Sequence, residues 1–70
     1  MNYVEWEKEY RKMVNEAGNL IIAYNRQRRK VDTLQAARVL DLKIFNLRRI
    51  RDDCLIKAQE LSEYKNSIAE

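Results

Sequence analysis

Positive charge is concentrated in the middle of this 70-residue chain. Residues 26–51 hold nine Lys and Arg against two Asp, a net charge of +7, whereas residues 1–25 and 52–70 carry −1 and −3. Arginine binds phosphate through paired hydrogen bonds, so such a cluster is typical of a nucleic-acid contact. The alternatives are a solvated helix end or one end of a head-to-tail assembly. The candidate phosphate contacts are Arg26, Arg28, Arg29, Lys30, Arg38 and Arg49.

Side chains that could carry out catalysis are few and badly placed. The single cysteine, Cys54, falls on an apolar repeat, and the chain has no histidine to activate it. Asp52 and Asp53 are adjacent, so on a helix their side chains point about 100° apart and cannot work as a carboxylate pair. Cysteine and histidine spacings that bind zinc are absent from the sequence. We therefore expect neither an enzyme nor a bound cofactor or metal.

Apolar residues recur at alternating intervals of three and four, which is typical of one helix packed on another. The sequence predicts an all-α fold: a two-helix antiparallel hairpin that turns near Asp32, in one domain over residues 1–70 with helices at about 3–30 and 33–67. The predicted packing residues of the first helix are Tyr3, Trp6, Tyr10, Met13, Ala17, Leu20, Tyr24 and Gln27. Those of the second are Ala37, Leu40, Ile44, Leu47, Arg51, Cys54, Ala58 and Leu61.

These two sets are mirror images about Asp32, so the pattern predicts which residues meet across the hairpin. Tyr3 is expected to face Leu61, and Met13 to face Arg51. At the turn, Asp32 and Gln35 have the spacing of a capping box, in which each side chain bonds the backbone of the other. We expect the first helix to run unbroken through Gly18.

A second apolar row lies on the opposite side of the second helix from the packing face. Its members are Leu34, Phe45 and Ile56, spaced by eleven residues, with Leu42 beside them. A hairpin that packs only on itself leaves this row in water, and such a row usually marks an interface. Ordering about 65 residues also costs on the order of 100 kcal/mol of conformational entropy. This is more than the free energy that apolar burial in one two-helix contact contributes. We therefore expect a homodimer, most simply a four-helix bundle, or an unidentified protein partner on the same row.

Residues 33–51 also resemble a DNA-binding helix-turn-helix. The resemblance implies that the chain turns at Asp41 and that the following residues form a recognition helix in the major groove of DNA. The residues at matching positions are Ala37, Asp41, Leu42, Leu47 and Ile50. As an uninterrupted hairpin, the chain instead resembles in outline the small dimeric bundle regulators, some of which bind RNA.

The remaining features favour a cytoplasmic protein. The longest apolar run, residues 20–24, is far shorter than the roughly 20 residues that span a bilayer. The first residues lack the basic and apolar segments of a secretion signal, and one cysteine cannot form an internal disulfide. We expect a small regulatory or adaptor protein that acts by protein–protein interaction and self-association, or alternatively a nucleic-acid-binding regulator.

Overall fold

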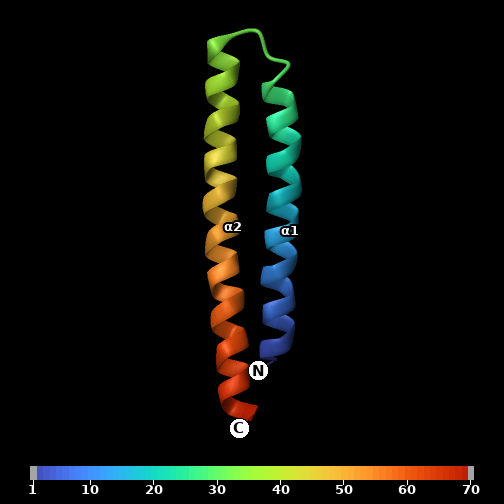
Figure 1. The fold of residues 1–70 in the computed structure, drawn as a ribbon, viewed down its shortest axis with the longest axis vertical. Coiled ribbons are helices and arrows are strands. Elements are labelled where there is room, and N and C mark those ends of the chain that lie inside the picture. The colour runs from blue at the N-terminus through green and yellow to red at the C-terminus, as the bar shows by residue number, and fades with distance from the viewer. Residues whose placement is uncertain (1, 70) are drawn as a thin grey trace.

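The computed structural model describes residues 2–69, with side chains for residues 2–67, as two helices joined by a short turn. Helix α1 is Tyr3–Arg28 and helix α2 is Leu34–Ala69. The two helices run antiparallel and side by side, and α2 extends beyond α1 at both ends (Figure 1). The molecule is a rod of 56 × 15 × 13 Å. The prediction of an all-helical hairpin is confirmed, and neither described helix contains a stretch apolar enough to cross a membrane.

The ends of α1 follow from local hydrogen bonding. The Asn2 side chain accepts a hydrogen bond of 3.2 Å from the backbone N–H of Glu5 and so caps the first turn. At the other end, the N–H groups of Arg29 and Lys30 donate to the carbonyls of Asn25 and Gln27, at 3.3 and 3.0 Å. The first bond spans four residues, as in an α-helix, whereas the second spans only three. The α-helical pattern therefore stops here, and α1 ends at Arg28, slightly before the predicted end.

The cap of α2 differs from the predicted one. The Thr33 hydroxyl accepts a hydrogen bond of 3.2 Å from the backbone N–H of Ala36. Thr33 is therefore the residue that caps α2, and the predicted capping box between Asp32 and Gln35 is wrong. The physical reason is position: Asp32 lies in the turn, one residue too early for its carboxylate to take the capping place.

Helix α2 runs without interruption through Asp41. A helix-turn-helix needs the chain to turn at that residue, and it would expose Ile44 at the start of a recognition helix. Ile44 is instead buried against α1, with 5% of its surface exposed. The structure therefore contradicts the helix-turn-helix interpretation of residues 33–51.

The packing face of α2 is the predicted one. Each predicted residue is buried or half-buried, and the most buried are Leu40, Ile44, Cys54 and Ala58. Arg51 also lies on this face, half-buried, with an ion pair of 3.3 Å to Asp52. The periodicity predicts this face correctly because the residues spaced by three and four in α2 form one packing face, and the second apolar row of α2 lies on the opposite side of the helix.

Helix α1 is rotated relative to the prediction. Tyr3, Tyr10, Ala17 and Tyr24 lie at the contact as expected, buried or half-buried. The intervening predicted residues are exposed instead: Trp6, Met13, Leu20 and Gln27. Their places are taken by the residues that follow them, the half-buried Glu7 and Val14 and the buried Ile21. The cause is that α1 is apolar over a wider arc than one contact needs, so two packing faces of equal spacing are available to it.

The register also differs from the mirror-symmetric one. The Met13 sulfur lies 3.8 Å from the Cys54 sulfur, whereas the symmetric register pairs Met13 with Arg51. The Tyr3 ring packs edge-on against the Tyr64 ring, with centroids 4.9 Å apart. Both contacts fall three residues farther along α2 than predicted, so α2 is displaced by roughly one helical turn.

Gly18 lies inside α1 without any conformational need for glycine. Its φ is not positive, and a Cβ built on it meets nothing within 4 Å. Gly18→Ala should therefore raise the stability by about 1 kcal/mol, the helix-propensity difference, and the melting temperature by several degrees. Thermal melts followed by circular dichroism at 222 nm measure this. A lower melting temperature would mean that another surface covers this position in solution.

Candidate interaction surfaces

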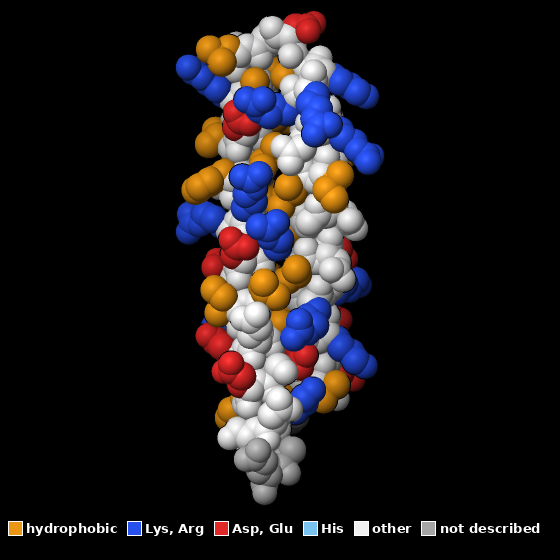
Figure 2. All heavy atoms as spheres, in the orientation of Figure 1, with side chains coloured by type: hydrophobic (Ala, Val, Ile, Leu, Met, Phe, Trp, Pro, Cys, Tyr) orange, Lys and Arg blue, Asp and Glu red, His pale blue; other side chains and the backbone are white. Residues whose placement is uncertain are grey.

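The row on the outside of α2 is exposed. Its four residues, Leu34, Leu42, Phe45 and Ile56, are between 52% and 67% exposed and point away from α1. Figure 2 shows hydrophobic side chains along this outer edge of α2 with charged side chains between them. Leu42 and Phe45 are one turn apart and make the centre of the row, whereas Leu34 and Ile56 each lie about 16 Å from Phe45 along the helix. We call these four residues the outer row.

A second apolar surface lies on α1, and it was not predicted because its residues have the same spacing as the residues of the helix contact. Trp6, Met13 and Leu20 stand at seven-residue intervals along α1 and are 44–46% exposed. Trp6 lies on one rim of a groove of about 390 Å³ between the helices at the open end of the hairpin. The groove is lined by Tyr3, Trp6, Tyr10, Lys57, Glu60, Leu61 and Tyr64. We call this surface, with its stripe Trp6, Met13 and Leu20, the side face.

A signal for the side face exists in the sequence. Val14 and Ile21 each follow a residue of the stripe and are apolar themselves, so α1 carries three apolar columns where a two-helix contact uses two. The column without a neighbour in the hairpin is the exposed one. The number of apolar columns, together with the spacing within each column, therefore indicates a surplus apolar face on α1.

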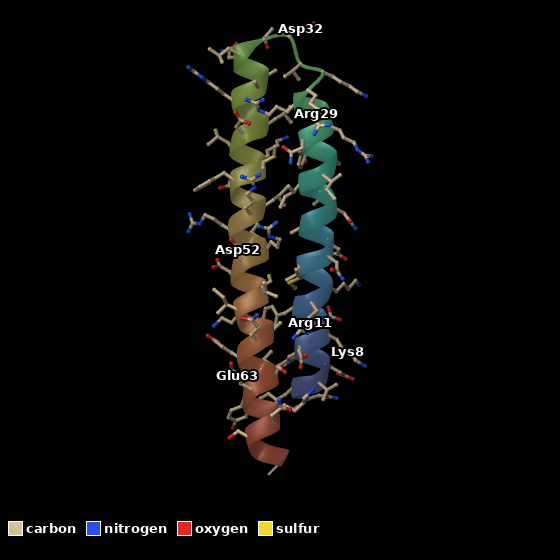
Figure 3. All side chains as sticks on the ribbon, in the orientation of Figure 1. Lys8, Arg11, Arg29, Asp32, Asp52 and Glu63 are labelled. Atoms are coloured by element: carbon tan, nitrogen blue, oxygen red, sulfur yellow. The ribbon has the colours of Figure 1, made fainter. Side chains whose placement is uncertain are left out.

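The predicted phosphate contacts do not all come together. Arg26, Arg29 and Lys30 lie at the end of α1 and in the turn, and Arg38 lies one turn into α2. Arg49, by contrast, lies about 22 Å from the start of α2. Figure 3 shows Arg29 and Asp32 at the turn end, with Asp52 and Glu63 farther down α2. We call Arg26, Arg29, Lys30 and Arg38 the basic turn end.

Arg28 has a structural partner. Its guanidinium donates through Nε and Nη2 to the two carboxylate oxygens of Asp41, the second bond measuring 3.2 Å. The hydrogen bonds to Asp41 raise the pKa of Arg28 above its usual range. The other five predicted contacts are exposed and make no ion pair within the part of the chain that the structure describes. Arg28 thus ties α1 to α2, and the others remain available to a ligand.

A second ion pair between the helices lies near the open end. Glu7, on the packing face of α1, accepts from Arg11 at 2.9 Å and from Lys65 of α2 at 3.4 Å. The hydrogen bond from Arg11, with the charge and hydrogen bond of Lys65, lowers the pKa of Glu7 below its ordinary value. Together with the ion pair of Arg28 and Asp41, this pair links α1 to α2 near each end of the hairpin.

Glu7→Gln should make the stability less dependent on pH. Because the folded-state pKa of Glu7 is lowered, its carboxylate stabilises the fold above the ordinary carboxyl pKa, and this contribution is lost as pH falls through the folded-state value. The variant should therefore melt a few degrees lower than the natural chain near pH 7 and at the same temperature near pH 2. Glu16→Gln, which removes an exposed carboxylate of α1 with no ion pair among the described residues, is the control. Equal melting temperatures of the natural and Glu7→Gln chains at pH 7 would contradict the prediction.

The side chains of Cys54 and Asp52, which were candidates for catalysis, contact other side chains of the hairpin. Cys54 is buried between the helices beside Met13, and Asp52 is paired with Arg51. Among the residues that the structure describes, no group of three or more His, Cys, Asp or Glu side chains could hold a metal ion.

The fold and its surfaces define a class: an all-helical two-helix hairpin with an exposed outer row, an apolar side face and a basic turn end. Comparison with protein-family models, with curated proteins and with solved structures gives no match to this chain.

Proposed function

We propose that this chain is a small non-enzymatic regulatory or adaptor protein that acts by packing its exposed helix faces against other helices. The outer row receives a helix of a partner protein, and self-association into a four-helix bundle completes the molecule. The observation that carries the proposal is the imbalance between buried and exposed apolar side chains. Among the residues whose side chains the structure describes, six are buried: two alanines, one cysteine, one leucine and two isoleucines. Thirteen large apolar residues of the same range are exposed.

The accessible surface supports the same proposal. The hairpin has 5748 Å² of accessible surface. A compact monomer of 8.4 kDa exposes roughly 4,600 Å², so the hairpin exposes an excess on the order of 1,000 Å². Burying part of this excess against another helix supplies the apolar contact that the single helix pair lacks.

The test of the outer row is Phe45→Asp, measured by chemical cross-linking and mass spectrometry of the tagged chain in its own cells. Phe45 is the aromatic residue at the centre of the row. Replacing it by Asp removes the contact area of the ring and forces a charged carboxylate into the interface. We expect the yield of one protein that cross-links to the natural chain to fall at least tenfold with the variant. Because Phe45 is exposed, the helical circular dichroism of the isolated variant should be unchanged.

The matched control is Asn46→Asp, which introduces the same charge one residue away on the exposed surface of α2. It should leave the partner yield within twofold of the natural chain. Equal yields from Phe45→Asp and the natural chain would overturn the role of the outer row, as would an equal loss from both variants.

A second candidate function is nucleic-acid binding by the basic turn end. The observation that favours it is that Arg26, Arg29, Lys30 and Arg38 are exposed and, among the described residues, unpaired. Exposed, unpaired arginines near one another attract phosphate and release counterions on binding. The test is fluorescence anisotropy with random-sequence DNA and RNA duplexes over a salt series. Absence of binding at low salt would mean that the basic turn end is a solvated helix end and not a nucleic-acid site.

A further inference from the structure

The side face is built by both helices, unlike the outer row. Its stripe Trp6, Met13 and Leu20 comes from α1, and the opposite rim of its groove, with Lys57 and Tyr64, comes from α2. A helix laid along this face touches α1 and α2 together. That is the arrangement in the core of a four-helix bundle, where each helix packs against two neighbours.

The columns of α1 point to the same geometry. A helix with one neighbour needs a narrow apolar stripe, whereas a helix with two neighbours needs a wider one. In α1, Val14 and Ile21 face α2. Met13 and Leu20 lie beside them and are 44% and 46% exposed, and the Met13 sulfur still touches Cys54 of α2. The seven-residue spacing of the stripe keeps its side chains in line along the rod, as a left-handed bundle requires.

The charges of the hairpin select the orientation of a second copy. Residues 26–51 carry +7 at the turn half, and residues 1–25 and 52–70 carry −1 and −3 at the open half. Two copies side by side in the same direction would place the two +7 segments against each other. Two copies in opposite directions place the basic turn end of each beside the acidic open end of the other, with Glu60 and Glu63 among its carboxylates.

A second copy must lie along most of the rod to bury the area that a dimer needs. The rod is 56 Å long and 15 Å wide, so a whole side projects roughly 800 Å², about the area that each partner buries in a standard interface. Met13 lies midway between Trp6 and Leu20, seven residues from each, or about 10 Å along the helix. A twofold axis at Met13 therefore places Trp6 of each copy opposite Leu20 of the other.

We propose that a second copy of this chain covers the side face in the antiparallel orientation, about a twofold axis close to Met13. This inference rests on the self-association proposed above and names its surface and direction. The outer row stays free on both sides of the resulting four-helix bundle, available to a partner protein.

Disulfide trapping tests the orientation. Two variants are made in a Cys54→Ala background, one with Trp6→Cys and one with Leu20→Cys, and are oxidised alone and as an equal mixture. The expected result is a cross-linked species of twice 8.4 kDa in the mixture, joining one Trp6→Cys chain to one Leu20→Cys chain, with at least tenfold less from either variant alone. Efficient cross-linking of each variant with itself would overturn the antiparallel orientation.

Light scattering of uncross-linked protein tests the surface. The natural chain should have the mass of a dimer at micromolar concentration. Met13→Asp and Leu20→Asp should each raise the dissociation constant at least tenfold, and Phe45→Asp should change it less than twofold. Leu20→Asp keeps the test decisive if Met13→Asp, whose side chain touches Cys54, fails to fold.

The outcomes separate this inference from the proposed function. A dimer that Phe45→Asp dissociates and Leu20→Asp does not would overturn the side face and leave self-association through the outer row. A natural chain that remains monomeric would overturn the second copy altogether. The outer-row capture experiment is independent of both results, because its readout is a different protein.

Discussion

Ile44→Ala should lower the free energy of unfolding by about 2–3 kcal/mol. Ile44 is 5% exposed on the packing face of α2, and replacing a buried isoleucine by alanine removes three methyl or methylene groups. The estimate is at the low end of the usual range, because a two-helix contact open to solvent on its sides relaxes more easily than a closed core. A domain of this size has a total stability of several kcal/mol, so a large fraction of the fold's stability depends on this one side chain.

Urea unfolding followed by circular dichroism measures this loss. The protein concentration is held fixed because the self-association that we propose would contribute to stability. The matched control is Ile22→Ala, the same substitution at a position of α1 that is 54% exposed and belongs to neither apolar surface. It should change the stability by less than about 0.5 kcal/mol. Equal effects of the two substitutions would contradict the packing of α1 on α2 through Ile44.

Reversing the charges of Arg29 and Lys30 together should weaken nucleic-acid binding at least tenfold at low salt. If the basic turn end contacts about four phosphates, the natural chain should show a log–log salt slope of about −4 on duplex DNA. Arg29→Glu with Lys30→Glu removes two contacts, so the slope should fall to about −2, and the two new carboxylates repel phosphate as well.

The control for this pair is Lys8→Glu with Lys12→Glu, which changes the net charge by the same amount near the open end of α1. Both lysines are exposed, and Figure 3 shows Lys8 far from Arg29 along the rod. If the basic turn end contacts the nucleic acid directly, only the variant with substitutions at the turn end should lose affinity. Equal loss from both variants would mean that net charge alone attracts the nucleic acid, and the basic turn end would not be a site.

The outer row was predictable from the sequence, whereas the side face was not. Exposure of Phe45 and the rest of the outer row follows from their angular distance from Ile44 and its neighbours on the same helix, which is a local property of helix geometry. The side face was not predictable in this way, because Trp6 and Met13 have the same spacing as true contact residues. The ion pair between Arg28 and Asp41 was also not predictable, because only the folded hairpin brings these two residues together.

The amino-acid sequence by itself determined the two helices, the position of the turn and the packing face of α2. These depend on backbone hydrogen bonds, capping and a single apolar stripe, all of which act between residues a few positions apart. The tertiary structure decided which face of α1 meets α2, the displacement of about one turn in register, and therefore which aromatic and apolar residues remain exposed. The physical reason is that α1 offers two packing faces of equal spacing, and the choice between them depends on how Val14 and Ile21 fit against residues that lie far away in the sequence.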